Sequence, residues 1–83
     1  MTQYLILCRS LSTAQRAART LERAGTTAMV VKAPAGLSKN GCGYGVSLRR
    51  DLTAALSVLD RARIPYGKVF SRPEGGEYRE VER

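Results

Sequence analysis

Four short strand-like segments alternate with two amphipathic helical segments, and this order constrains the fold of the 83-residue chain more than any other feature. Apolar and β-branched residues gather at residues 4–8, 27–33, 44–50 and 66–72, which we expect to be strands. Residues 44–50 alternate between apolar and polar or small side chains, as in a half-buried strand. A proline follows the second and the fourth segments and ends them, because proline donates no hydrogen bond to a sheet.

The two helical segments are indicated by their end signals and by the spacing of their apolar residues. Ser12 and Gln15 have the form of a capping box, so Ser12 is the predicted N-cap of a helix that runs to about residue 24, before Gly25. Asp51 is the predicted N-cap of a second helix, which ends near residue 64 because Pro65 disfavours helical geometry before it. The apolar stripes are Ala14, Ala17, Ala18, Leu21 and Ala24 in the first helix, and Leu52, Ala55, Leu56, Leu59 and Ala62 in the second.

The order β-α-β-β-α-β predicts an α+β, ferredoxin-like fold. This fold is a split β-α-β sandwich with two helices on one face of an antiparallel sheet, in strand order 4-1-3-2. Residues 1–72 would form a single domain, and residues 73–83 a polar C-terminal tail that we expect to be flexible. In this topology the end of the first strand lies beside the start of the third, and the first helix begins at the same edge.

Charge and cysteine content exclude several classes of function. The net charge is +7, with +9 in residues 1–72 and −2 in residues 73–83, which favours an anionic partner. The chain has two cysteines and no histidine, so we expect no disulfide scaffold, no zinc site, no Cys–His catalytic pair and no cofactor. No apolar run approaches the roughly 20 residues of a membrane helix, and the N-terminus lacks the features of a signal peptide. We therefore expect a cytoplasmic protein that makes no contact with a membrane.

Cys42 is the candidate reactive group, because it lies between Gly41 and Gly43 in a loop just before the third strand. Glycine neighbours let backbone N–H groups approach the sulfur or an oxyanion. Arg9 and Lys39 could add positive charge, and the helix start around Ser12 could add unpaired N–H groups. These features lower the pKa of a thiol and hold an anionic adduct.

Cys8 has a different setting, at the end of an apolar strand. One interpretation is a small buried apolar side chain. The other is a resolving thiol that forms a disulfide with Cys42, or a redox switch with it, which requires Cα atoms within about 7 Å. The predicted strand pairing permits this approach.

The chain resembles the small bacterial family of selenium/sulfur carrier protein-like domains over roughly residues 3–70. The likeness includes Ser12-Thr13 before an alanine-rich helix, Gly25, Pro34, Cys42-Gly43 before the alternating strand with Leu48, the helix after Leu52, and Tyr66-Gly67. The resemblance implies a carrier rather than an enzyme, which holds sulfur or selenium on Cys42 as a persulfide or selenopersulfide. It also implies a desulfurase-like donor protein and an acceptor protein.

A basic binding module for nucleic acid or an acidic protein, with Cys42 incidental, is the alternative hypothesis. Ferredoxin-like domains that bind RNA stack bases on aromatic side chains beside basic ones. The sequence offers aromatic and basic residues whose strand parities could bring several onto one face, or which could pack the core: Tyr4, Tyr44, Tyr66, Phe70, Lys68 and Arg50.

Overall fold

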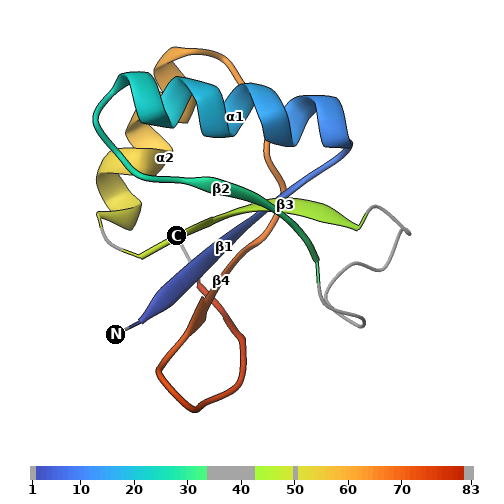
Figure 1. Ribbon diagram of the computed structural model, residues 1–83, viewed down its shortest axis with the longest axis vertical. Helices are drawn as coiled ribbons and strands as arrows, with labels where there is room; N and C mark the ends of the chain where they lie inside the picture. Colours follow the sequence, from blue (N-terminus) through green and yellow to red (C-terminus); the bar gives the residue numbers. More distant parts are fainter. Residues whose placement is uncertain (1, 34–42, 50, 82–83) are drawn as a thin grey trace.

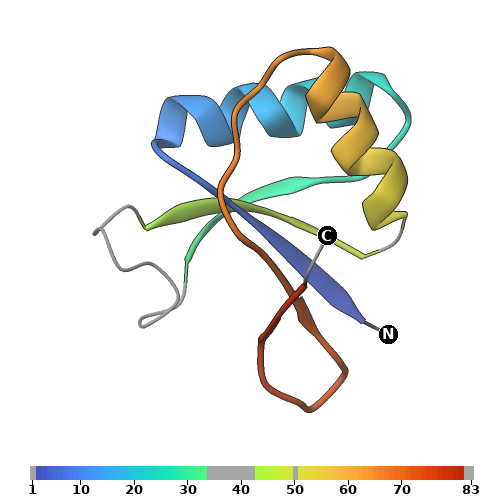
Figure 2. The same ribbon diagram turned by 180° about the vertical axis from the view of Figure 1, so that it is seen from behind.

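Two helices pack on one face of an antiparallel sheet (Figures 1 and 2). This computed structural model describes residues 2–33, 43–49 and 51–81. The elements there are β1 (Gln3–Cys8), α1 (Leu11–Arg23), β2 (Met29–Lys32), β3 (Tyr44–Leu48), α2 (Leu52–Arg61), β4 (Val69–Arg72) and β5 (Arg79–Glu80). The sheet order β2-β3-β1-β4-β5 contains the predicted order 4-1-3-2 and differs from it by the addition of β5 beside β4. The α+β ferredoxin-like prediction is confirmed.

The chain after residue 72 continues the sheet. β5 pairs antiparallel with β4, with Phe70 opposite Glu80, and the Val81 N–H donates to the Val69 carbonyl at 2.7 Å. Lys68 and Glu80 add an exposed ion pair with an N–O distance of 3.5 Å. The boundary predicted at residue 72 therefore lies within a hairpin, between two paired strands.

Three of the four predicted strands, β2, β3 and β4, are shorter than the apolar segments that predicted them, whereas β1 begins one residue earlier, at Gln3. β4 begins at Val69 rather than residue 66, although the segment before it still bonds to β1. The Gly67 N–H donates to the Leu7 carbonyl at 2.7 Å, and the Leu7 N–H donates to the Lys68 carbonyl at 3.0 Å. Residues 66–68 thus follow β1 without regular ladder geometry.

The N-cap of α1 differs from the prediction, whereas the N-cap of α2 is Asp51 as predicted but lacks the expected side-chain bond. Ser10, not Ser12, caps α1: its backbone is extended (φ −150, ψ 165) and its hydroxyl accepts the Thr13 N–H at 3.2 Å. Asp51 precedes α2 but makes no side-chain cap bond, because its backbone is left-handed (φ 57, ψ 45). Side-chain capping requires an extended N-cap backbone, so only the Asp51 carbonyl, which accepts the Ala55 N–H at 2.9 Å, begins the helix.

Both helices end in a left-handed residue. Gly25 (φ 89) follows α1, and Arg63 (φ 57) occupies the equivalent place after α2. In each case the N–H of the next residue returns to a carbonyl of the last turn, at 2.9 and 3.0 Å respectively. This is the Schellman arrangement. Gly25 adopts it without strain, whereas the side chain of Arg63 makes the same backbone unfavourable.

The sheet buries apolar side chains on both faces. The larger cluster lies between sheet and helices and includes Ile6, Cys8, Val46, Leu48 and Val69 with the predicted helix residues Ala14, Ala17, Ala18, Leu21, Ala55, Leu56 and Leu59. The smaller cluster, on the open face, is Leu5, Leu7 and Phe70. Gly45 permits this packing, because a Cβ there would lie 2.7 Å from the Ile6 carbonyl oxygen and 3.0 Å from Leu5 Cδ1.

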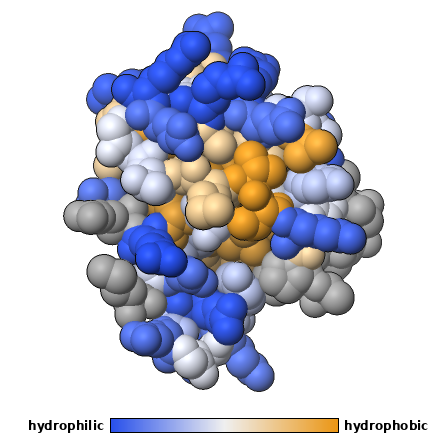
Figure 3. All heavy atoms as spheres, in the orientation of Figure 1, coloured by the Kyte–Doolittle hydropathy of each residue, from blue (hydrophilic) through white to orange (hydrophobic). Residues whose placement is uncertain are grey.

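One edge of the sheet carries exposed apolar surface. β2 pairs only with β3 in the described sheet, and Met29 on it is 65% exposed. Figure 3 shows an apolar area across β2, with hydrophilic side chains above and below it. The charged residues of α1 thus cover the outside of the helix layer and leave this edge apolar.

Candidate functional site

The predicted convergence of three segments at one edge of the sheet is present. Cys8 at the end of β1 lies opposite Tyr44 at the start of β3. The Ala33 N–H after β2 donates to the Gly43 carbonyl, so the described residues on either side of the segment 34–42 lie side by side. We call this end of the sheet the Gly43 edge. Cys42, Gly41 and Lys39 were predicted to act here, and they lie outside the described residues.

The first helix begins at the same edge. α1 starts directly after Arg9 and Ser10, and both residues are exposed. Its first turn contains no acidic residue, so the partial positive charge of the helix start is not offset within the helix. Ser12 lies exposed in this first turn rather than at the cap. The sequence signal for the missed cap is a serine, Ser10, three residues before Thr13. In the structure the hydroxyl groups of these two residues lie 3.1 Å apart.

Cys8 is packed inside the protein. Its residue is 3% exposed and belongs to the cluster between sheet and helices, and its Sγ lies 3.8 Å from the Ile6 carbonyl oxygen. Burial raises the pKa of the Cys8 thiol from 9.0 to about 11, because the thiolate would lose its hydration. The interpretation of Cys8 as a small buried apolar residue is confirmed. A resolving role for Cys8 stays a prediction, because Cys42 lies outside the described residues.

The four aromatic residues considered for RNA binding, Tyr4, Tyr44, Tyr66 and Phe70, do not form a stacking platform on the open face of the sheet. Tyr4, Tyr44 and Tyr66 pack against the cluster on the helix side, and the Tyr66 hydroxyl donates to Asp60 Oδ1 at 3.2 Å. Phe70 lies on the other face and is only 8% exposed. These four rings therefore pack against the two apolar clusters and do not lie free on one face, which weakens the aromatic part of the argument for RNA binding.

Two kinds of feature are absent from the part of the chain that is described: a membrane-spanning helix and a cluster of metal-ligating side chains. None of its helices is long and apolar enough to cross a bilayer. The same residues contain no group of three or more His, Cys, Asp or Glu side chains positioned to hold a metal ion.

Comparison with protein-family models gives a match to a known family. The model of the family described as "Putative Se/S carrier protein-like" matches residues 3–71. This range covers β1, β2, β3, both helices and all of β4 except Arg72, and it includes Cys42. The searches of curated proteins and of solved structures return no match.

Proposed function

Because the chain belongs to the Se/S carrier protein-like family, we propose that it is a small thiol carrier. Cys42 holds a sulfur or selenium atom, as a persulfide or selenopersulfide, and relays it from one protein to another. The carrier acts by group transfer and needs no cofactor.

The observation that carries the proposal is the burial of the other thiol. The chain has two cysteines, and the thiolate is the reactive form of each. Cys8 is enclosed between sheet and helices, and its raised pKa of about 11 keeps it protonated near neutral pH. A carrier sulfur must be both ionised and reachable by two large protein partners. Cys42 is the remaining candidate.

The Gly43 edge supplies groups suited to an anionic sulfur. Gly43 follows Cys42 directly and is held to β2 through its carbonyl, so its position relative to the sheet is defined. The N-terminus of α1 and the exposed Arg9 lie at the same edge. In the proposed mechanism Arg9, Lys39, the helix start near Ser12 and the backbone around Gly41 stabilise the thiolate.

The transfer conserves electrons and atoms. The Cys42 thiolate attacks the terminal sulfur of a donor persulfide, a sulfur–sulfur bond forms on Cys42, and the donor leaves as its own thiolate. An acceptor thiolate then attacks the terminal sulfur on Cys42 and regenerates the Cys42 thiolate. Selenium follows the same scheme. We propose a desulfurase-like donor, a separate acceptor protein, and the cytoplasm as location, since that compartment keeps thiols reduced.

Intact-protein mass spectrometry after incubation with a cysteine desulfurase and cysteine tests the proposal. We expect the protein to gain the mass of one sulfur atom and to lose it again to a small acceptor thiol. Cys42→Ser should take up no sulfur, whereas the matched variant Cys8→Ala should load like the natural protein. Equal loading of Cys42→Ser and the natural protein would overturn the proposal.

The same variant separates the carrier from a binding module. Affinity for RNA that falls with salt and is unchanged in Cys42→Ser, together with no sulfur loading, would favour the module.

A further inference from the structure

Three polar side chains form a row across the open face of the sheet, at the end opposite the Gly43 edge. Gln3 on β1 lies opposite Arg72 on β4. Tyr4 lies opposite Leu48 on β3, so Arg49, the next residue, falls beside Gln3 on its other side. Neighbouring strands are about 4.8 Å apart. Two arginines therefore flank one carboxamide on adjacent strands.

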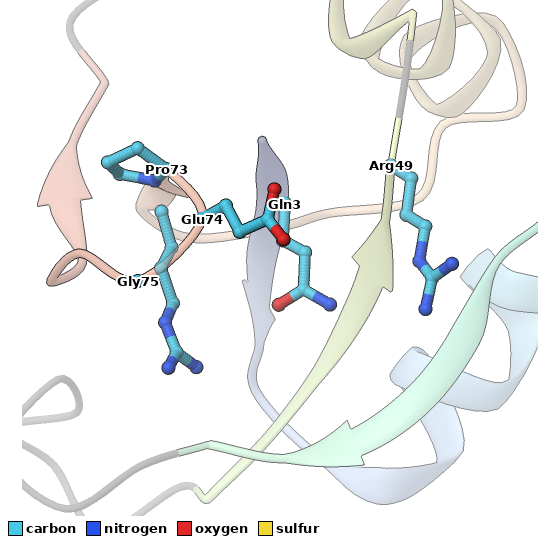
Figure 4. Close-up of a pocket in the computed structure, with 6 residues that line it drawn as sticks. Gln3, Arg49, Pro73, Glu74 and Gly75 are labelled. Carbon is cyan, nitrogen blue, oxygen red and sulfur yellow. The ribbon is translucent and has the colours of Figure 1, made fainter. Parts of the chain in front are cut away.

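A surface hollow of about 460 Å³ lies over this row. Gln3, Arg49 and Arg72 line it together with Pro73, Glu74 and Gly75. Figure 4 shows the Gln3 carboxamide and the Arg49 guanidinium directed the same way into the hollow. The remaining wall is the turn between β4 and β5, which the bond from the Gly76 N–H to the Pro73 carbonyl closes at 2.9 Å.

Arg72 is held in place before any ligand binds. Its Nε donates to the Gly76 carbonyl at 3.1 Å, and its guanidinium carbon lies 5.4 Å from the centre of the Tyr78 ring. A cation over an aromatic face is attracted to it. Because Nε is used by the turn, the two terminal amino groups of the fork carry the donors for a ligand. Fixing the side chain in advance reduces the conformational entropy that binding would lose.

The donor set selects the charge and shape of the ligand. One guanidinium fork already matches both oxygens of a monocarboxylate. Two forks with a carboxamide between them offer donors to more oxygens and charge for two negative units. A tetrahedral dianion of the phosphate or sulfate type has the additional oxygens to accept these hydrogen bonds and carries two negative charges. We propose that this hollow is a binding site for a tetrahedral dianion, either free or as the ester group of a small molecule.

Glu74 also lines the hollow, and Figure 4 shows its carboxylate directed toward Gln3. Its carboxylate repels an incoming anion, so the site in the natural protein is weaker than its arginines alone would make it. The site is independent of the proposed sulfur carriage. Gln3 and Cys8 are at opposite ends of β1, about 17 Å apart at the rise of an extended strand.

NMR titrations of the whole protein at constant ionic strength test the proposal, with sodium phosphate, sodium sulfate, glycerol 3-phosphate and sodium acetate as probes. We expect saturable shifts at the Gln3 side-chain amide and at the 73–76 turn with the three dianions, and much weaker binding of acetate. Arg49→Ala should weaken binding about tenfold or more, since a hydrogen bond to a charged group is lost. Glu74→Gln should strengthen it.

The matched control is Arg23→Ala, which removes the same charge from the last turn of α1 on the helix layer. It should change the affinity less than about twofold, because exposed charges more than a Debye length apart are screened. Equal weakening by Arg49→Ala and Arg23→Ala, or shifts that never saturate, would show only general attraction to a basic surface and would overturn the proposal. Tighter binding of glycerol 3-phosphate than of phosphate would identify an ester as the ligand, and equal binding the free dianion.

Discussion

Alkaline pH should weaken the fold through Cys8. Burial raises the pKa of this thiol from 9.0 to about 11, so above pH 9 the unfolded chain loses the Cys8 proton while the folded protein keeps it. The stabilising contribution is therefore fully present below pH 9 and is lost as the pH rises toward 11. Since one pKa unit corresponds to about 1.4 kcal/mol, the total loss is on the order of 3 kcal/mol, and about half of it is reached by pH 10.

Urea unfolding of the natural protein and Cys8→Ala, under reducing conditions, isolates this effect. Tyrosines, lysines and Cys42 titrate in both proteins, so they cancel in the difference between the two free energies of unfolding. We expect Cys8→Ala to cost about 1 kcal/mol near pH 7.5, because it removes a buried side-chain atom. Near pH 10 this difference should fall by about 1 kcal/mol, to near zero, since only the natural protein must keep the Cys8 thiol protonated in order to fold.

A difference that stays constant between these two pH values would refute the reasoning. It would mean that Cys8 ionises as easily in the folded protein as in the unfolded chain, which is incompatible with a side chain that is 3% exposed among apolar neighbours. Native-state alkylation gives an independent reading. Cys8 should react only as fast as the protein opens, and it should react readily once urea has unfolded the chain.

Five further substitutions test three local features through the free energy of unfolding in urea. Ser10→Ala should cost about 1 kcal/mol and Ser12→Ala less than about 0.5, because only Ser10 caps α1; equal costs would contradict that cap. Gly45→Ala should cost about 1–3 kcal/mol, since its Cβ would meet a carbonyl oxygen at 2.7 Å. Gly67→Ala, with its nearest contact at 3.6 Å, should be tolerated, and a similar loss at both sites would argue against the clash. Arg63→Gly should stabilise the protein by about 0.5–1 kcal/mol by relieving a left-handed backbone, and a destabilised variant would refute the strain.

The fold could be predicted because its signals are periodic and agree with one another. The helix stripe centred on Ala17 and Leu21 is buried, and the alternation of Tyr44, Val46 and Leu48 places these three side chains on the helix side of the sheet. Once helices and strands alternate in this order, the short connections leave few sheet orders, and the predicted one is present. The fifth strand was weakly signalled, because Arg79 and Glu80 are polar and their pairing depends on the preceding turn.

Local backbone conformation was harder to predict than topology. Asp51 is a residue that often caps helices, yet its left-handed backbone turns the side chain away from the helix N–H groups. Arg63 adopts a conformation that glycine usually provides, because the chain must reverse after α2. The backbone conformation at these two residues depends on how each connection joins the sheet, and the conformational preferences of single residues do not predict this.

Only the part of the candidate site that follows from the strand order could be predicted from the sequence. Antiparallel pairing of β1 with β3 brings Cys8 opposite Tyr44, and this follows from the topology alone. The row of Arg49, Gln3 and Arg72 at the other end was not predicted, although strand parity could have indicated it. It depends on the register between three strands and on a turn that only the folded chain defines.

The most direct test of sulfur carriage is where the transferred atom resides in the natural protein. The protein is loaded by a cysteine desulfurase with isotopically labelled cysteine, alkylated without reduction, digested, and read peptide by peptide. The account predicts the labelled sulfur on the peptide that contains Cys42 and none on the peptide that contains Cys8. Label on Cys8, or label on neither cysteine while the desulfurase itself is charged, would contradict it.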